Sequence, residues 1–341
     1  MRRRRTPGAD CVAVTGAAAP LGRALLDRLA ARPGDAPDLV GLDARDPLLA
    51  DHLPGVTTVV HLDVSFDALG DPLARTALNV KGTASLLEAA RVAGVRRVVL
   101  LTSVDVYGAP SGGAVPLAED APLLAAADGS LTGDLIEVER LAQHAALTGL
   151  EVVVLRPAAV VGGQLGPAYD GSLLHSLSAA RLLAVRGVEP LWQLCHADDL
   201  LAALELAALG QGSGGLVVAC DGWLTQREVE ELSGRRRLEL PASVALSTAE
   251  RLHRVGATSG SPRELDRLLH PLVVDASRLR ALGWSPTWTN VEALIAHLAN
   301  RPTPTGRTAA YTTAGATAAG ATVAMVGTAA LVRRARRRRG R

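Results

Sequence analysis

The 341-residue sequence has few aromatic side chains and few cysteines, and each shortage narrows what the protein can be. Aromatic residues make up 2% of the chain, so a core must be built mainly from alanine, valine and leucine. The cysteines are Cys11, Cys195 and Cys220, an odd number without the spacing of a metal site. We therefore expect reduced, buried thiols, a cytoplasmic location and no bound metal.

Lysine occurs once in the sequence, as Lys81, and tyrosine occurs as Tyr107, Tyr169 and Tyr311. None of the tyrosines stands four residues before the lysine, so the chain contains no Tyr-x-x-x-Lys pair. In such a pair the lysine lowers the pKa of the tyrosine, which then transfers a proton. The sequence therefore excludes any reaction that depends on this pair, and we expect Lys81 on the surface or at the edge of a cofactor site.

The net charge of +2 hides two basic clusters at the ends of the chain. Four arginines lie at positions 2–5, and seven lie between positions 333 and 341. Without these 11 residues, 25 basic side chains remain against 34 acidic ones, a formal charge of −9. An acidic body argues against specific nucleic-acid binding, although the tails could contact anionic lipid or nucleic acid non-specifically.

An uncharged stretch precedes the C-terminal arginines, from Thr308 to Val332. As a helix, its 25 residues would extend about 37 Å, which is long enough to span a bilayer. Alanine, glycine and threonine dominate it, however, and a single span would place seven arginines outside, against the positive-inside tendency. The alternatives are a true span, shallow membrane contact through residues 308–341, and a soluble flexible tail.

Residues 12–22 read VAVTGAAAPLG, an apolar strand followed by a turn of small residues and the start of a helix. Gly16 and Gly22 allow the backbone to approach a ligand and the helix to pack tightly on the strand. This is the usual way in which a dinucleotide pyrophosphate is held.

Short apolar runs alternate with helical patterns along the first half of the chain. The runs typical of strands are Cys11–Thr15, Leu39–Asp43, Thr57–Asp63, Arg97–Thr102 and Glu151–Arg156. The helical patterns are Leu21–Ala31, Pro47–Leu53, Ala74–Ala93 and Leu131–Leu147. Near-continuous apolar strands separated by amphipathic helices predict an α/β fold, a doubly wound parallel sheet of Rossmann-like type.

Several further motifs follow in order between Cys11 and Leu294. They are Thr15-Gly-Ala-Ala-Ala-Pro-Leu-Gly22, Asn79-Val-Lys-Gly-Thr83, Thr102-Ser-Val-Asp-Val-Tyr-Gly108, Leu155-Arg-Pro157, His196-Ala-Asp-Asp199 and Gly283-Trp-Ser-Pro286. Together they resemble the extended short-chain dehydrogenase/reductase superfamily, in particular its NAD-dependent epimerase/dehydratase family. The resemblance implies NAD as cofactor and a sugar-nucleotide or hydroxy-carbonyl substrate.

The resemblance also implies a division of the chain. We expect a basic disordered N-terminus at 1–9, an NAD-binding Rossmann-like domain at 10–165, a smaller and partly interleaved substrate lobe at 166–300, and a tail at 301–341. The lobe would include a short strand at Leu216–Cys220 and lie over the carboxyl ends of the main strands. The expected partners are a dinucleotide and an unidentified small molecule, with a homodimer as one candidate assembly.

Twelve residues occupy the family's cofactor-binding positions. They are Thr15, Gly16, Ala19, Pro20, Leu21, Gly22, Asp43, Leu62, Asn79, Thr102, Arg156 and Pro157. The middle glycine of the family's turn is Ala19 here, and its methyl group narrows the space under the pyrophosphate without necessarily closing it.

Asp43 ends the second strand-like run, about 20 residues after the glycine turn. A carboxylate at this place accepts hydrogen bonds from the ribose hydroxyls and repels a 2′-phosphate, so NAD is favoured over NADP. The distance to the next strand is short for the family, and the segment Asp43–Asp46 also matches the end of its third strand. On either alternative, strand two or strand three would be trimmed.

The resemblance places Ser103 where the family orients its substrate and Asp105 where some dehydratases carry an acid. Glu139 matches the glutamate that follows the family's lysine, which puts Leu131 at the tyrosine position and Leu135 at the lysine position. Neither leucine transfers a proton. The chain is therefore expected to be a catalytically silent NAD-binding protein or, alternatively, an oxidoreductase or epimerase that uses Ser103 and Asp105 instead.

Two histidines near these motifs are predicted to be structural. His61 lies in a strand-like run, where the family often has a structural histidine. His196 ends another run, and Asp198 or Asp199 is expected to cap the helix after it. We therefore do not assign His196 as a catalytic base.

Overall fold

The computed structural model describes residues 10–33, 36–46, 48–68, 70–108, 115–163, 182–254 and 270–299. The basic clusters at both ends and the uncharged stretch at 308–332 lie outside these ranges. No helix within the described ranges is long and apolar enough to cross a membrane.

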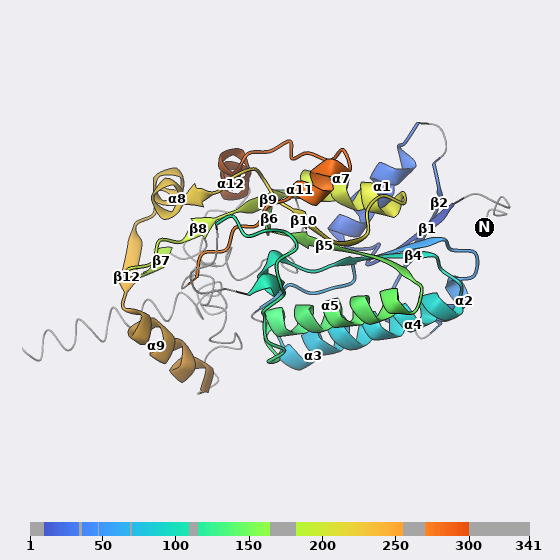
Figure 1. Cartoon of the computed structure of the whole chain (residues 1–341), viewed down its shortest axis with the longest axis horizontal. Helices are drawn as coiled ribbons and strands as arrows, with labels where there is room; N and C mark the ends of the chain where they lie inside the picture. Colours follow the sequence, from blue (N-terminus) through green and yellow to red (C-terminus); the bar gives the residue numbers. More distant parts are fainter. Residues whose placement is uncertain are drawn as a thin grey trace, which may run out of the picture.

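A six-stranded sheet in which every neighbouring pair is parallel forms the centre of the molecule (Figure 1). In spatial order, its strands are β10 (Gly214–Val218), β5 (Glu151–Pro157), β4 (Arg97–Leu101), β3 (Thr58–His61), β1 (Cys11–Thr15) and β2 (Asp38–Leu42). The inner strands are buried along their length because helices cover both faces of the sheet. This order confirms the predicted doubly wound Rossmann-like fold.

Two sets of helices cover the sheet (Figure 1). On one face lie α1 (Pro20–Ala30), α7 (Ala197–Ala208) and α11 (Ser277–Ala281). On the other lie α3 (Pro72–Thr76), α4 (Thr83–Val92) and α5 (Leu131–Leu147). The expected single helix over 74–93 is α3 and α4 joined by a π-helical segment, η1 (Ala77–Gly82).

The prediction that Leu216–Cys220 belongs to the C-terminal lobe was wrong. This run overlaps β10, which pairs with β5 at the edge of the main sheet. Helix α7 carries the chain from β9 (Leu194–His196) back over the sheet, and β10 can therefore run parallel to β5. Partners so far apart in sequence leave no local signal of their pairing.

The remaining elements form a smaller lobe beyond the carboxyl ends of the main strands (Figure 1). Its two-stranded pairs are β6–β9, β7–β12 and β8–β11. The strands are β6 (Ala159–Val161), β7 (Leu182–Val185), β8 (Leu191–Trp192), β11 (Leu224–Thr225) and β12 (Arg237–Leu240). The helices are α8 (Gln226–Ser233), α9 (Ala242–Arg254) and α12 (Asn290–Ala299).

The three cysteines are buried thiols without disulfide bonds, as predicted. Cys11 lies in β1 and Cys195 in β9, while Cys220 follows β10. Burial raises the pKa of Cys220 to about 12, so the thiol stays protonated near neutral pH.

Candidate functional site

The turn after β1 depends on a glycine at its first position. Gly16 has a φ of +66°, and a Cβ built there would lie 3.0 Å from the backbone of Leu62 and Asp63 after β3. The N–H of Ala19 donates to the Gly16 carbonyl at 2.9 Å and closes the turn. A side chain at position 16 would therefore be strained and would also push against the neighbouring strand.

Helix α1 begins directly on this turn. Pro20 is its first residue, and a Cβ at Gly22 would lie 2.3 Å from the Gly16 carbonyl oxygen. The N-cap residue Ala19 makes no side-chain hydrogen bond to the helix, and the first turn contains no acidic residue. The helix start thus presents uncapped N–H groups at its positive end, which suits an anionic group such as a pyrophosphate.

Ala19, where the family pattern has glycine, fits this turn without strain. Its φ of −74° and ψ of 156° lie in the extended region that any residue adopts. The substitution therefore leaves the backbone path around the helix start intact.

The side chains of Thr15 and His61 form a buried hydrogen-bonded pair next to the turn. The Thr15 hydroxyl accepts the N–H groups of Leu62 and Asp63 at 3.1 and 3.3 Å and lies 2.8 Å from His61 Nδ1. The other ring nitrogen, Nε2, lies 3.2 Å from the hydroxyl of Thr83.

The contacts of Thr15, His61 and Thr83 show which of their atoms carry the protons. Thr83 donates its hydroxyl proton to the Asn79 carbonyl, so His61 Nε2 must donate to Thr83, and Nδ1 accepts from Thr15. This arrangement requires a neutral ring. Burial lowers the pKa of His61 to about 4, which keeps the ring neutral at physiological pH. His61 therefore has the structural role predicted for it.

Asn79 holds the segment that follows β3. Its amide oxygen accepts the N–H of Ser65, and its amide nitrogen donates to the Ser65 carbonyl, both at 2.8 Å. Asn79 is fully buried, so it acts on the predicted site by fixing this segment beside the turn. Leu62 is also buried, in the same segment.

Asp43 lies at the end of β2, which resolves the two alternatives for its register. The third strand ends at His61 and is followed by its own carboxylate, Asp63. Both strands are present, with 5 residues in β2 and 4 in β3. The connection is short because α2 (Leu49–His52) has only 4 residues.

Asp43 and Asp63 both interact with Arg45. Asp43 Oδ1 accepts the Arg45 backbone N–H at 2.9 Å and its Nε at 3.2 Å, while Asp63 Oδ2 lies 3.8 Å from Nε. Hydrogen bonds from Arg45 lower the pKa of Asp43. Burial raises the pKa of Asp63, and the Arg45 charge opposes that effect. Neither Arg45 nor Asp63 was predicted from the sequence as a site residue.

The two candidate catalytic residues contact each other after β4. Ser103 is the N-cap of a short 3-10 helix, η2 (Val104–Tyr107), and accepts the Asp105 N–H at 3.2 Å. Its hydroxyl donates to Asp105 Oδ2 at 3.1 Å. Both side chains are half-buried, so this pair can hydrogen-bond a ligand at the carboxyl end of β4.

Leu131 and Leu135, which the sequence analysis matched to the family's tyrosine and lysine positions, lie in the first two turns of α5. Leu131 and Leu135 are 5% and 1% exposed and belong to the main hydrophobic core. The acid between them, Asp134, is buried and accepts hydrogen bonds from Arg75 Nε and the Thr76 hydroxyl at 2.8 and 2.7 Å. It is therefore held in an ion pair between α3 and α5.

A buried network links α5 to β4 and β5. Glu139 accepts hydrogen bonds from the Thr102 hydroxyl at 2.9 Å and from Arg156 Nε and Nη2 at 2.8 and 2.9 Å. Arg156 Nη1 donates to the Tyr107 hydroxyl at 2.9 Å, and that hydroxyl donates to the Glu119 carbonyl at 2.6 Å. The side chains of Thr102 and Arg156 are thus engaged inside the protein, so a contact of either residue with the cofactor would have to come from its backbone.

The electrostatics of this network oppose a catalytic role for Tyr107. Burial raises the pKa of Tyr107, and the Arg156 charge only partly offsets this. Burial also disfavours the Arg156 charge, but Glu139 outweighs it, so the pKa of Arg156 is raised. Pro157 ends β5 beside the network and is buried.

The structure gives His196 the capping role that the sequence analysis assigned to an aspartate. His196 is itself the N-cap of α7, its Nδ1 accepts the Asp198 N–H at 3.2 Å, and its ring stacks on Trp288. Asp199 instead accepts hydrogen bonds from Thr287 and the Trp288 backbone. Lys81 is exposed, as predicted.

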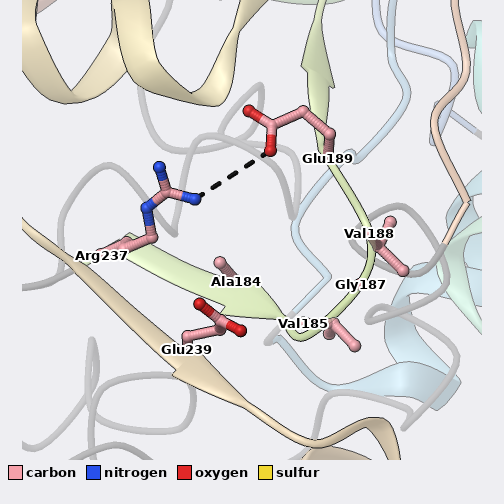
Figure 2. A pocket seen from close by; sticks show the side chains of 7 residues that line it. All are labelled: Ala184, Val185, Gly187, Val188, Glu189, Arg237 and Glu239. Carbon is pink, nitrogen blue, oxygen red and sulfur yellow. Dashed lines mark ion pairs between the residues drawn. The ribbon is translucent and has the colours of Figure 1, made fainter.

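A separate cavity of about 230 Å³ lies in the lobe, lined by residues of the paired strands β7 and β12 and of the loop that follows β7 (Figure 2). Val185 and Val188 line it together with Arg237, which lies 4.0 Å from Glu189. None of the predicted site residues lines this cavity. Within the described ranges, no group of three or more histidine, cysteine or acidic side chains is placed to hold a metal ion.

The doubly wound sheet and the glycine turn on its first strand place this chain among the Rossmann-like α/β proteins. The chain belongs to the NAD dependent epimerase/dehydratase family, whose model matches residues 12–218. This membership confirms the resemblance found in the sequence.

Relatives with and without an assigned activity are similar in sequence to most of this chain. An uncharacterised protein of Mycobacterium tuberculosis is 30% identical over 77% of this chain and 71% of its own. A 3-diazoavenalumate denitrifying reductase of a Streptomyces species is 30% identical over 81% of this chain and 96% of its own. A UDP-glucose 4-epimerase of Mycolicibacterium smegmatis is 28% identical over 80% and 92%.

Solved structures share the fold. MoeE5 in complex with UDP-glucose and NAD has a TM-score of 0.61 and 24% identity, covering 84% of this chain and 97% of its own. The dTDP-glucose 4,6-dehydratase DesIV of Streptomyces venezuelae, with NAD and TYD bound, has a TM-score of 0.62 and 21% identity, covering 85% and 96%. At these identities the likeness concerns the fold alone.

Proposed function

We propose that this protein binds NAD(H) at the turn after β1 and does not carry out the proton transfer on which the family's usual reaction depends. The observation that carries the proposal is the contrast between the two parts of the site. The uncapped start of α1 against Gly16 suits a pyrophosphate, whereas Leu131 and Leu135 are buried among apolar side chains. The first part serves binding, and the second offers no acid or base.

Each part of the dinucleotide has a candidate partner. Gly16, Ala19, Pro20, Leu21 and Gly22 would surround the pyrophosphate, with the first-turn N–H groups as donors. Asp43 would accept the adenosine ribose hydroxyls. Thr15 and Asn79 would keep the segment after β3 in position by the contacts described above. The names of relatives and structural neighbours, which include NAD and sugar nucleotides, support this assignment.

When bound, NAD supplies hydride chemistry, and the chain's own residues would orient the ligands around it. Ser103 lies at the carboxyl end of β4 and would hydrogen-bond a substrate oxygen. Leu131 and Leu135 would exclude water from that side. Binding and orientation without an acid/base group suit a sensor, a scaffold or a regulator.

A second candidate function is a reaction in which Ser103 and Asp105 replace the missing pair. The 3.1 Å hydrogen bond from the Ser103 hydroxyl to Asp105 favours it, because the carboxylate can polarise that hydroxyl. The substrate would be a sugar nucleotide, which the name of the UDP-glucose 4-epimerase among the relatives supports, or a hydroxy-carbonyl compound. This reaction would make the protein an oxidoreductase or an epimerase.

Titration of the purified protein with NADH, followed by fluorescence, tests the main proposal. We expect saturable binding by the wild-type chain and strongly weakened binding by Gly22→Ala, because its Cβ would push the helix start away from Gly16. Gly82→Ala is the matched control, since a Cβ there meets nothing closer than 3.8 Å. Absence of binding at millimolar NADH would refute the proposal.

A search for turnover separates the two functions. With NAD bound, we expect no absorbance change at the NADH band when sugar nucleotides or hydroxy-carbonyl compounds are added. A substrate-dependent change at this band, or conversion of a sugar nucleotide to its epimer without such a change, would support the second function if it is lost in Ser103→Ala. Identification of a co-purified ligand by mass spectrometry would name the substrate class directly.

The location and the assembly are part of the same proposal. A protein that uses NAD and keeps its thiols reduced belongs in the cytoplasm, and residues 308–341 would add contact with an anionic membrane. Fractionation of cells expressing the full chain and a chain ending at residue 300 tests the tail. Light scattering of the purified protein tests the proposed homodimer.

A further inference from the structure

Glu119 is a buried acid whose two carboxylate oxygens contact different elements at the edge of the main sheet. Oε1 accepts the backbone N–H of Val217 in β10 at 2.6 Å, and Oε2 accepts the backbone N–H of Arg278 in α11 at 2.8 Å. Because β10 is an edge strand of the six-stranded sheet, a side chain accepts the Val217 N–H in place of another strand. Only 4% of Glu119 is exposed, so its carboxylate is a fixed connection between β10 and α11.

The side chain of Arg278 extends this connection along the edge of β10. Its Nη1 and Nη2 donate to the carbonyls of Gly215 and Ser213 at 2.9 and 3.2 Å. Arg278 and Glu119 together bind backbone groups at alternate residues from Ser213 to Val217. The start of α11 is therefore joined to the strand by both side chains.

The segment that leads to Glu119 is paired with the segment that leads to α11. The Leu117 N–H donates to the Val273 carbonyl at 2.7 Å, and the Asp275 N–H donates to the Leu117 carbonyl at 2.9 Å. Residues 117–119 thus contact the chain on both sides of the start of α11.

The backbone of Glu119 holds the end of η2. The Tyr107 hydroxyl donates to the Glu119 carbonyl at 2.6 Å, and the N–H groups of residues 124 and 125 donate to carbonyls of η2 at 3.2 and 3.3 Å. This is the helix that Ser103 caps and that carries Asp105. One residue therefore links the candidate catalytic segment to the far edge of the sheet.

The carboxylate is held in this place at an energetic cost. Burial raises the pKa of Glu119, and the charge of Asp275 adds to this effect, while the N–H groups of Val217 and Arg278 and the Arg278 charge oppose it. In return, the carboxylate fixes two backbone groups in one geometry, which an apolar side chain of the same size would not do.

We propose, taking the substrate-orienting role of Ser103 from the proposed function, that Glu119 is a positioning residue for Ser103 and Asp105. Its carboxylate fixes the segment 117–125 to β10 and α11. Its carbonyl then holds the end of η2 through the Tyr107 hydroxyl. Glu119 touches no ligand itself and sets the place of the two side chains that would.

Backbone amide exchange of the ligand-free full chain, measured by NMR, tests this role. The amides of Val106 and Gly108 report on η2, because both donate within its turn, at 3.2 and 3.0 Å. In Glu119→Gln one of the two bound N–H groups loses its acceptor, and exchange at both amides should become about tenfold faster. Amides of β1 should exchange as in the wild type, which separates a local release of η2 from a global loss of stability.

Asp120→Asn is the matched control. It removes a charge from the exposed residue next to Glu119 and should leave exchange in η2 unchanged. If Glu119→Gln does not fold, Arg278→Pro tests the same contact, because it removes the donor N–H from the first turn of α11, where proline is tolerated. Arg278→Ala keeps that N–H, so exchange in η2 should be at least about threefold faster in Arg278→Pro than in Arg278→Ala.

A double-mutant cycle tests the route through Tyr107. Tyr107→Phe removes the hydroxyl and should by itself speed exchange at Gly108. If Glu119 acts through this hydroxyl, adding Glu119→Gln to Tyr107→Phe should change the rate by less than about threefold. Effects that multiply in full would refute this route and the positioning role with it.

The place of side chain 103 can be followed chemically in Ser103→Cys. The native thiols are buried and react slowly, so alkylation by iodoacetamide reports on the introduced thiol. Adding Glu119→Gln should change the alkylation rate by at least about threefold, whereas adding Asp120→Asn should not change it. An equal rate in all three proteins would refute the positioning role.

These measurements need no dinucleotide, so their outcome is separate from that of the proposed function. If exchange at Val106 and Gly108 is the same in Glu119→Gln and the wild type, or rises equally in β1, the positioning role is refuted even when NADH binds. If exchange and alkylation respond as expected but NADH does not bind, the proposed function fails and the link from Glu119 to η2 stands.

Discussion

Glu139 on α5 takes two hydrogen bonds from the Arg156 guanidinium on β5, at 2.8 and 2.9 Å, in a part of the molecule where both side chains are almost fully buried. The same carboxylate accepts the Thr102 hydroxyl, so one side chain of α5 links two neighbouring strands. Gly215 on β10 completes the arrangement, because a Cβ there would lie 2.4 Å from the guanidinium carbon. This contact positions the helix that carries Leu131 and Leu135.

Removing one partner of this pair should destabilise the protein strongly. In Glu139→Gln the buried guanidinium loses its counter-charge, and we expect the free energy of unfolding to fall by about 3–5 kcal/mol. Urea unfolding followed by circular dichroism measures the change. Glu137→Gln on the same helix removes a more exposed partner of Arg140 and should cost about 1 kcal/mol or less. Equal losses in the two variants would contradict the structural role of Glu139.

Leu135 should contribute to stability and not to cofactor binding. Leu135→Ala removes a side chain that is 1% exposed in the main core, and we expect a loss of about 2–5 kcal/mol in unfolding free energy. NADH affinity of the folded protein should stay within a factor of about two, since an aliphatic side chain forms no hydrogen bond to a ribose.

Leu147→Ala on the same helix is the control for this substitution. Leu147 is 87% exposed, so truncation of its side chain should change the unfolding free energy by less than about 0.5 kcal/mol. If the Leu135→Ala variant is fully folded and still loses much of its affinity for NADH, position 135 contacts the cofactor after all.

The local elements of the fold were predictable because their signals are local. The apolar runs that became β1, β3, β4 and β5 were recognised within two residues of their observed ends. The position of β10 was not, since a strand reveals its pairing partner only through contacts distant in sequence. The short connection between β2 and β3 was visible as a spacing in the sequence, and the structure places the 4-residue α2 in it.

In the candidate site, too, the residues with a local signal were predictable and those joined by distant contacts were not. The glycine turn and Asp43 could be placed by motif and spacing, whereas Arg45 and Asp63 join the site only when β2 and β3 lie side by side with β1. The ion pair between Glu139 and Arg156 had a signal in the sequence. Glu139 was placed one turn after Leu135, and a buried acid on that helix face requires a cation, which could have assigned Arg156 to it.

The neutral ring of His61 should make stability depend on pH. The pKa of His61 is lowered to about 4 in the folded protein, and the unfolded chain has a value of about 6.5. The unfolded state therefore takes up a proton first as the pH falls. The contribution of His61 is complete above about pH 6.5 and is lost progressively down to about pH 4, by about 3 kcal/mol in total.

Urea unfolding at pH 7.0 and at pH 5.0 measures this effect. His61→Gln should be less stable than the wild type at pH 7.0, because it disturbs the contacts to Thr15 and Thr83, and its loss on acidification should be smaller. His52→Gln, which removes a more exposed histidine on α2, should keep the wild-type difference between the two pH values. Identical pH dependence in the wild type and His61→Gln would contradict the buried neutral ring.

The contact between Ser103 and Asp105 leads to a prediction that separates capping from catalysis. Ser103→Ala removes the N-cap of η2, and we expect a loss of about 1 kcal/mol in unfolding free energy, measured by urea titration. If the contact is only a cap, NADH affinity stays unchanged and Ser103→Thr restores stability, because threonine keeps the hydroxyl.

If the pair transfers protons, Ser103→Ala and Asp105→Asn should each reduce any substrate-dependent turnover by about 10²–10⁴-fold. Turnover that survives both substitutions would remove Ser103 and Asp105 from the chemistry, and the reacting groups would then have to be sought on another element at the carboxyl edge of the sheet.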